Sequence, residues 1–359
     1  MDLSFYKDKS VFITGHTGFK GSWLCKMLTD AGAKVTGYAL EPPTTPNLFE
    51  LSKVEEKITS VKGDIRDLEH LKSVVREAQP EIVIHMAAQP LVRDSYQRPV
   101  YTYEVNVMGT VHVLECIRVT DSVKSFVNVT TDKVYLNREW EWGYRENEVL
   151  NGYDPYSNSK SCSELVTDSY RNSFFQEREV AISTARAGNV IGGGDFAADR
   201  IVPDCIRALQ QNRAILVRNP YSVRPYQHVL EPLAAYLMIA QKQYENRKYE
   251  GSYNVGPDDV DCWTTGQLVT RFCELWNQEN GTSVTWENRH DGGPHEAKLL
   301  KLDCSKLKTT FGWKPTWNMD IALEKVEEWT KVYFEGGDIP ACMSRQILSY
   351  CKDTTFALG

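Results

Sequence analysis

An acidic and an amino side chain stand next to each other at the end of an apolar run. The run 125–129, Ser-Phe-Val-Asn-Val, is typical of a buried strand, and the chain then passes through Thr131 to Asp132 and Lys133. Residues at the carboxyl end of a parallel strand can reach a ligand bound there. We therefore interpret Thr131, Asp132 and Lys133 as catalytic residues, with the acid and the amine as a proton-transfer pair. A strand end with solvated charges is the simpler alternative.

A tyrosine and a lysine lie four residues apart at the start of a helical pattern. On a helix, Tyr156 and Lys160 would share one face. Tyrosine has an ordinary pKa of about 10, but a nearby ammonium stabilises the phenolate and lowers that pKa. We expect Tyr156 to take a proton from a substrate hydroxyl with the help of Lys160. A surface tyrosine and lysine would show the same spacing, so the glycine loop upstream gives the pattern its specificity.

Three glycines at intervals of three residues follow the strand-like run 10–15. They are Gly15, Gly18 and Gly21. Glycine permits a tight turn, close approach of the backbone to a pyrophosphate and close packing of helix on strand, while the helix N-terminus offers N–H groups to the anion. The order of strand, glycine loop and helix predicts a dinucleotide site.

Further cofactor contacts are expected from the loop and from the ends of the neighbouring strands. His16 and Lys20 could reach phosphate or ribose, or could be solvated. With Tyr156 and Lys160, the remaining residues assigned to this site are His16, Phe19, Asp64, Ile65, Ala87, Ala88 and Gln89.

The second strand should end in an acid that binds the adenosine ribose. The sequence has Tyr38, Ala39 and Leu40 there, with Glu41 slightly late and no arginine for a 2′-phosphate. NAD is therefore preferred over NADP.

Six β-type apolar runs alternate with segments of helical length as far as residue 192. This alternation predicts an α/β fold of the Rossmann type, a doubly wound parallel sheet covered by helices on both faces. We expect the NAD-binding domain to span 1–188, with a return to the sheet within 226–256. Residues 189–225 and 257–359 are expected to form a smaller α/β lobe that binds the substrate.

The composition excludes several classes of protein. With 359 residues, 42% hydrophobic residues and a net charge of −7, the chain lacks the basic character of a nucleic-acid-binding protein. We expect no membrane span, because no apolar stretch is long enough, and no secretory signal in the first residues, which predicts a cytoplasmic protein. The nine cysteines include no Cys-x-x-Cys pair, which argues against a disulfide framework.

The combined motifs resemble the extended short-chain dehydrogenase/reductase family, whose members act on nucleotide sugars. The glycine loop, Thr131, the Tyr156/Lys160 pair and the segment 185–192 carry the resemblance, which extends over nearly the whole chain. Thr-Asp followed by a third catalytic residue is similar to the sugar-nucleotide 4,6-dehydratases, most of which have glutamate third. Lysine in third place resembles the branch that acts on CDP-glucose.

This resemblance implies a redox-neutral dehydration that uses NAD. Tyr156 would take the 4-hydroxyl proton with Lys160 and Thr131 assisting, Asp132 would protonate the leaving 6-hydroxyl, and Lys133 would lie near C5. An ammonium cannot accept a proton, and an adjacent carboxylate favours the ammonium. Lys133 must therefore become neutral beside bound ligand, or stay charged and stabilise the enolate.

Recognition of a CDP-glucose substrate is assigned to three residues. Arg224 is expected to contact the diphosphate, and Asn189 and His228 follow from the resemblance. A surface arginine, a turn asparagine and a core histidine are the alternatives. His290 and His295 lack further ligands at suitable spacing, so we predict no metal site.

Two other functions share part of this pattern. A sugar-nucleotide epimerase or decarboxylase would need the loop and Tyr156/Lys160 but not Asp132 and Lys133, whereas a non-catalytic NAD sensor would have no reason to keep Tyr156, Lys160 and Thr131 intact. The segment 102–118 suggests the interface of a homodimer or a dimer of dimers.

Overall fold

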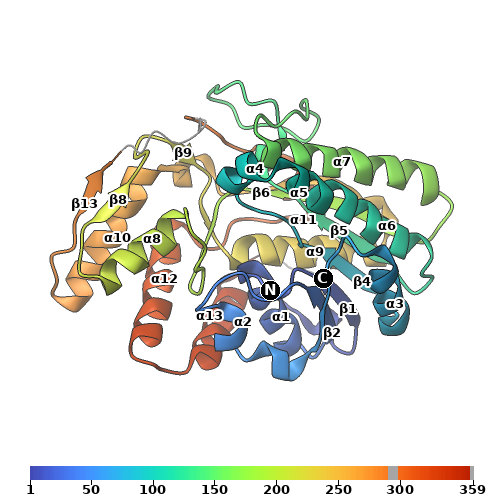
Figure 1. Ribbon diagram of the computed structural model, residues 1–359, viewed down its shortest axis with the longest axis horizontal. Coiled ribbons are helices and arrows are strands. Elements are labelled where there is room, and N and C mark those ends of the chain that lie inside the picture. The colour runs from blue at the N-terminus through green and yellow to red at the C-terminus, as the bar shows by residue number, and fades with distance from the viewer. Residues whose placement is uncertain (290–297, 356–359) are drawn as a thin grey trace.

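A seven-stranded parallel sheet forms the centre of the protein (Figure 1). The computed structural model describes residues 1–289 and 298–355. The strand order is β11-β6-β5-β4-β1-β2-β3. The strands are β1 (Ser10–Thr14), β2 (Lys34–Ala39), β3 (Thr59–Lys62), β4 (Ile82–His85), β5 (Ser125–Val129), β6 (Ala181–Ala187) and β11 (Gly251–Val255). The predicted Rossmann-type fold is confirmed, and the expected return of the chain to the sheet is seen in the parallel pairing of β11 with β6.

Helices cover both faces of this sheet, and the strands are therefore apolar on both sides. In β1, Val11 and Ile13 pack into one core and Phe12 packs into the core on the opposite face. All three are fully buried, as expected for a parallel strand between two helix layers. One layer contains α1 (Phe19–Asp30) and α9 (Leu230–Glu245), and the other contains α3 (Leu68–Ala78), α6 (Gly109–Arg118) and α7 (Pro155–Phe174).

A second, smaller lobe lies at the left of Figure 1. It has its own apolar core, formed by side chains such as Ile206, Leu268 and Leu323. Its elements are α8 (Ile201–Gln210), β8 (Ile215–Val217), α10 (Thr265–Asn280), β13 (Trp286–Asn288) and α12 (Met319–Phe334). Short two-stranded pairings link the intervening segments, namely β7 (Val190–Ile191) with β10 (Gln227–His228) and β9 (Val223–Arg224) with β12 (Trp263–Thr264).

The last helix contacts the sheet-bearing part of the chain. In α13 (Ile339–Asp353), the Ser344 hydroxyl donates to Asp30 of α1 at 2.8 Å. The segment 257–359 therefore includes residues that pack on the Rossmann helices as well as residues of the lobe. The division into 1–188 with 226–256, and 189–225 with 257–359, stays a prediction.

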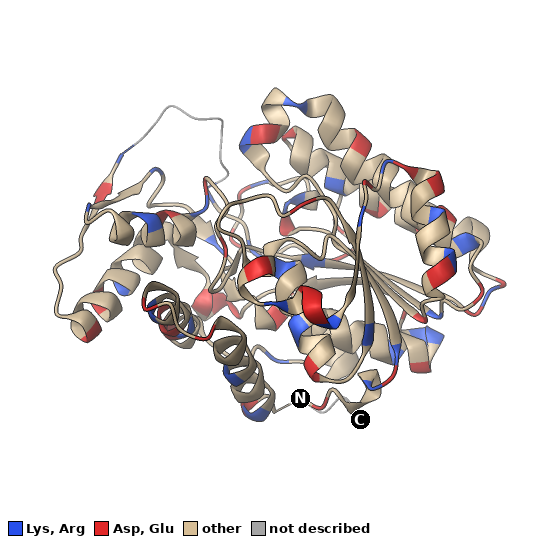
Figure 2. Cartoon of the chain, turned by 60° about the horizontal axis from the view of Figure 1, so that its bottom comes forward, with Lys and Arg blue, Asp and Glu red and all other residues tan. Residues whose placement is uncertain are grey.

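Charged residues of both signs are interspersed along the helices of both parts (Figure 2). Among the described residues, no helix is both long enough and apolar enough to span a membrane.

The remaining helices above the sheet are α4 (Val92–Gln97) and α5 (Pro99–Tyr103), and the short π-helix η3 (Glu104–Met108) joins α5 to α6.

Candidate active site

The turn between β1 and α1 brings backbone segments unusually close together. Gly15 has a φ of +78°, a conformation that favours glycine, and a Cβ there would lie 2.8 Å from the Ala87 nitrogen. A Cβ at Gly21 would lie 2.2 Å from the Gly15 carbonyl oxygen. These two glycines allow the loop to fit between the end of β4 and the first turn of α1.

Gly18 has a different environment. An added Cβ would contact only the Gly15 carbonyl oxygen, at 3.5 Å, and the φ of −79° is open to any residue. Gly18 is also the N-cap of α1, where N–H groups of the first turn lack helical partners. The space beside Gly18 and these N–H groups fits the pyrophosphate of a dinucleotide.

His16 is not solvated. Its ring is fully buried, its Nε2 lies 2.8 Å from the Ser60 hydroxyl, and it packs edge-on against Phe49. Burial lowers the pKa of His16 to about 4, so the ring is neutral at physiological pH. The imidazole is directed toward β2 and β3, where Gly37 leaves room for it.

The other residues predicted for the cofactor lie around the same edge of the sheet, with different partners. Asp64 forms an ion pair with Arg66 at 2.7 Å, which helps to hold the pKa of Asp64 below its usual value against the opposing effect of burial. Ile65 packs against Gly109. The Gln89 amide nitrogen donates to Leu91 and to the Thr102 hydroxyl, so this side chain is engaged with its own loop and with α5.

Three small or aromatic residues complete this set. The Ala87 N–H donates to the Thr14 hydroxyl at 3.1 Å, and Ala88 follows it at the partly exposed loop. Phe19, the first residue of α1, lies against Gly192 beyond β6. At the end of β2, the Tyr38 hydroxyl donates to the Asp64 carbonyl at 3.0 Å. The contacts of Phe19, Asp64, Ile65, Ala87, Ala88 and Gln89 with the cofactor stay predictions.

The start of α7 places Tyr156 and Lys160. Asp154 caps the helix by accepting the Ser157 N–H at 2.9 Å, and Pro155 occupies the first helical position. Tyr156 and Lys160 are both nearly buried and lie on the face of α7 that meets the sheet. The Lys160 ammonium donates to the Val129 carbonyl at the end of β5, at 3.1 Å.

The turn after β5 brings the acid and the amine together. Asp132 is fully buried, and its Oδ1 accepts from the Thr131 hydroxyl at 2.9 Å and from the Lys133 ammonium at 3.0 Å. Its Oδ2 has no hydrogen-bond partner within the described chain. Lys133 also donates to Oδ1 of Asn189, at 3.1 Å. A buried carboxylate oxygen without a partner is costly unless a ligand completes its hydrogen bonding.

The expectation that Lys160 lowers the pKa of Tyr156 is wrong for the free protein. Burial raises the pKa of Tyr156 to about 12, with the Thr131 side chain and Arg200 opposing the rise. Burial also lowers the pKa of Lys160 to about 8, and the Glu164 carboxylate opposes that change. The spacing correctly placed Tyr156 and Lys160 on one face of α7. Desolvation, however, affects the pKa of Tyr156 more strongly than nearby positive charges do.

The three residues predicted to bind substrate have distinct surroundings. Asn189 contacts Lys133, and the Gln227 N–H donates to the Asn189 carbonyl at 3.0 Å. Arg224 lies in β9 next to Pro225, which packs on Gly188 close to Asp132. Asn189 therefore lies beside the catalytic turn, whereas the contact of Arg224 with substrate stays a prediction.

His228 is a core residue. Its ring is fully buried with its centroid 4.9 Å from that of Trp317, and Nδ1 accepts the Leu230 N–H at 3.3 Å. Burial lowers its pKa to about 3. This placement favours the structural alternative over a substrate contact. His290 and His295 lie outside the described residues.

Two cationic residues lie near the site. The sequence pattern gave no role to Arg200 and left the role of Lys20 open. Arg200, which bonds Asp195 at 2.9 Å, lowers the pKa of Tyr156, although no spacing pattern connects the two. Burial, followed by the charges of Lys160 and Arg200, lowers the pKa of Lys20 to about 7. Lys20, the second residue of α1, is only partly exposed and lies close enough to Lys160, Asp132 and Lys133 for their charges to influence its pKa.

Comparison with known proteins agrees with this geometry. The family model described as GDP-mannose 4,6-dehydratase matches residues 12–326. The chain belongs to this family. The resemblance to the sugar-nucleotide 4,6-dehydratase branch of the extended short-chain dehydrogenases/reductases is thereby confirmed.

Curated relatives agree with this classification, and solved structures share the fold. A CDP-glucose 4,6-dehydratase of Salmonella typhimurium is 49% identical over 99% of both chains, and a dTDP-D-glucose 4,6-dehydratase of Mus musculus is 26% identical over 91% of this chain and 90% of the relative. The structure of a dTDP-glucose 4,6-dehydratase from Bacillus anthracis in complex with NAD has a TM-score of 0.73 at 21% identity, covering 92% of this chain and 98% of the other. That structure supports the fold.

Gly18→Val tests the assignment of the cofactor loop. The branched side chain would enter the open space beside Gly18 without a backbone clash, so the fold should survive. Overpacking of about 1–3 kcal/mol would weaken NAD binding by about tenfold or more. Calorimetric titration with NAD measures the affinity, and the melting temperature should be unchanged. As a contrast, Gly21→Ala should lower the melting temperature, because its Cβ would collide with the Gly15 backbone. Unchanged NAD affinity in Gly18→Val would contradict the assignment.

Proposed function

We propose that the protein is an NAD-dependent hydro-lyase that converts CDP-D-glucose to CDP-4-keto-6-deoxy-D-glucose and water. The observation that carries this conclusion is the buried Asp132 beside Lys133 and Tyr156, with one carboxylate oxygen left for a ligand. The relative of the same activity, 49% identical over 99% of both chains, supports the choice of CDP-glucose within the family.

The first half of the reaction uses the residues at the start of α7. Tyr156 accepts the proton of the sugar 4-hydroxyl after losing its own proton, and the Thr131 hydroxyl and the charge of Arg200 favour this phenolate form against the effect of burial. Lys160, fixed on the Val129 carbonyl, adds positive charge beneath the reacting groups. NAD, held by the glycine loop after β1, would supply reversible hydride transfer for C4 and C6 of the sugar.

The second half requires proton transfer at two further atoms. Once C4 is a ketone, the hydrogen on C5 becomes acidic. Lys133 is assigned to C5, either as a base or as a charged group that stabilises the enolate, and Asp132 is assigned to protonate the 6-hydroxyl as it leaves. An epimerase needs no such pair, so the burial of Asp132 next to Lys133 favours dehydration over epimerisation.

The substrate diphosphate needs local positive charge because the chain carries a net charge of −7. Arg224 is assigned to it, since guanidinium groups bind phosphate oxygens in pairs and β9 lies beside the catalytic turn. Asn189 is assigned to the sugar side of the site, where it already contacts Lys133.

A direct assay tests the function. Incubation with NAD and CDP-glucose, without any other reductant, should produce a 4-keto-6-deoxy sugar, detected by its absorbance in alkali, while free NADH does not accumulate. UDP-glucose, dTDP-glucose and GDP-mannose at the same concentration serve as controls and should react more slowly. Faster turnover of any of these three would overturn the choice of substrate, and a C4 epimer as the product would overturn the reaction.

Lys133→Met separates the two halves of the reaction. Hydride transfer from C4 should remain possible because Tyr156, Lys160 and Thr131 are unchanged. Product formation should fall by about two orders of magnitude, as for loss of a general base, and NADH absorbance should persist on the enzyme. In deuterated water, C5 should no longer take up solvent label. Normal labelling of C5 in this variant would remove Lys133 from the mechanism, and Lys133→Glu tests whether a carboxylate restores exchange.

We further propose that the protein is a cytoplasmic homodimer. Its nine free cysteines are typical of a reducing compartment. The helices α5, η3, α6 and α7 contact one another and expose the apolar side chains Val100, Met108, Leu165 and Phe174. An exposed apolar group of this kind favours association with a second copy.

Leu165→Glu should weaken the dimer, because it places a charge in the apolar face of α7. Light scattering after gel filtration should give about twice 40.9 kDa for the unmodified protein and a smaller mass for the variant at low concentration. Leu348→Glu, at an equally exposed position on α13, is the matched control and should leave the mass unchanged. A mass of 40.9 kDa for the unmodified protein at all concentrations would contradict the proposal.

A further inference from the structure

Glu164 of α7 and Arg186 of β6 form an ion pair directly behind the catalytic turn. The Arg186 Nη2 lies 2.9 Å from the Glu164 Oε2, and the side chains are only 3% and 2% exposed. Removing both charges from water is costly, so a buried pair of this kind persists only with additional hydrogen bonds. The hydrogen bonds of this pair show which segments of the chain it holds together.

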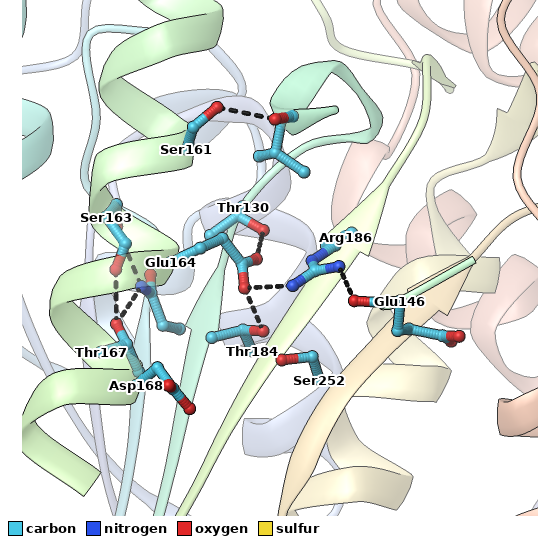
Figure 3. A network of polar contacts seen from close by, with 12 residues as sticks. Thr130, Glu146, Ser161, Ser163, Glu164, Thr167, Asp168, Thr184, Arg186 and Ser252 are labelled. Atoms are coloured by element: carbon cyan, nitrogen blue, oxygen red, sulfur yellow. Dashed lines mark hydrogen bonds and ion pairs between the residues drawn. The ribbon is translucent and has the colours of Figure 1, made fainter. Parts of the chain in front are cut away.

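Glu164 binds Thr130, the residue just before the catalytic turn (Figure 3). The Thr130 hydroxyl donates to Oε1, and the Thr184 hydroxyl of β6 donates to Oε2 at 2.6 Å. Thr130 immediately precedes Thr131, the first catalytic residue of the turn. The carboxylate therefore connects the end of β5 with both α7 and β6.

Arg186 binds Tyr135, which follows the catalytic turn. Its Nη1 donates to the Tyr135 hydroxyl at 2.8 Å and to the Glu146 carbonyl at 3.0 Å, and the guanidinium lies 5.2 Å from the centre of the Tyr135 ring. The Tyr135 hydroxyl in turn donates to Asn254 of β11 at 2.6 Å. Tyr135 is the second residue after Lys133, so the ion pair contacts the chain on both sides of Asp132 and Lys133.

Two further side chains of α7 contact the same segment. The Lys160 ammonium donates to the Val129 carbonyl at 3.1 Å, and the Ser161 hydroxyl donates to the Val134 carbonyl at 2.7 Å. Lys160 and Glu164 are one helical turn apart, so one face of α7 carries both the catalytic lysine and the acid of the ion pair.

We propose that the Glu164–Arg186 pair is a positioning device that fixes the Thr131–Asp132–Lys133 turn relative to Tyr156 and Lys160. The proposal rests on the proposed dehydratase function. Oxidation at C4 depends mainly on Tyr156 and Lys160 of α7, with Thr131 assisting, whereas elimination depends on Asp132 and Lys133, both of which lie on the turn held by the pair. A displacement of about 1 Å can cost about 100-fold in rate. Loss of the pair should therefore slow elimination more than oxidation.

Arg186 stays charged inside the protein. Burial favours a neutral Arg186, but the Glu164 carboxylate and the Tyr135 hydroxyl raise the pKa of Arg186 above its ordinary value. Replacing one member alone would leave a buried charge without its partner, which destabilises a fold strongly. The experiment therefore uses variants that avoid an isolated charge.

Thr130→Val and the double variant Glu164→Leu/Arg186→Met test the proposal. The first removes only the hydroxyl that links the turn to Glu164, with Thr130→Ser as the conservative variant that should restore it. The second replaces the whole pair by apolar side chains. In both, we expect kcat with CDP-glucose to fall by about 10- to 100-fold with KM unchanged, and NADH to accumulate on the enzyme because elimination is the step that slows.

A second measurement does not depend on the substrate. With NAD at saturation, amide hydrogen exchange in 130–135 should accelerate in Thr130→Val and in the double variant, and should return to normal in Thr130→Ser. Glu231→Gln is the matched control, because Glu231 is a buried carboxylate of α9 that binds the Trp317 N–H and the Tyr350 hydroxyl away from the turn. It should lower the melting temperature without NADH accumulation or faster exchange in 130–135.

Two results would overturn the positioning role. One is that folded variants keep the normal kcat and form no persistent NADH, which would leave the pair with a structural role alone. The other is unchanged amide exchange in the turn. If the unmodified protein forms no 4-keto-6-deoxy sugar from CDP-glucose, the proposed function fails, and the exchange measurement still decides whether the pair holds the turn.

Discussion

The candidate site depends on the attachment of α7 to the end of β5. The Lys160 ammonium donates to the last carbonyl of that strand, and Glu164 one turn later binds the next hydroxyl along the chain. A helix and a strand that are joined in this way cannot shift independently. As a result, Tyr156 on the helix and Asp132 after the strand, which come from separate parts of the sequence, share one site.

Burial controls the electrostatics of this site. It raises the pKa of Tyr156 to about 12 and lowers that of Lys20 to about 7, so in each case burial shifts the balance toward the neutral form. Asp132 is enclosed with one oxygen unpaired, and cationic residues surround it although the chain as a whole is acidic. Burying such groups lowers the stability of the free protein. In the complex they can interact with charges that develop on a ligand.

Local patterns predicted the backbone well and the directions of side chains poorly. Glycine spacing located the β1–α1 turn because the turn itself requires glycine, and the Tyr156/Lys160 spacing located one face of α7. His16 and His228, in contrast, are packed in the interior, since neighbours distant in the sequence determine which way a side chain points. Nothing in the sequence around Arg186 indicates its pairing with Glu164, because Glu164 belongs to another element.

The sequence by itself determined the fold class, the dinucleotide loop and the chemical type of the catalytic residues, because these follow from periodicity and from short motifs whose residues act together locally. Tertiary structure alone decided that Asp132 is fully buried, that Lys133 meets Asn189, and that one ion pair holds both sides of the turn. Burial and pairing depend on how β5, β6 and α7 pack against one another. Desolvation, the largest influence on the pKa of Tyr156, exists only once that packing has formed.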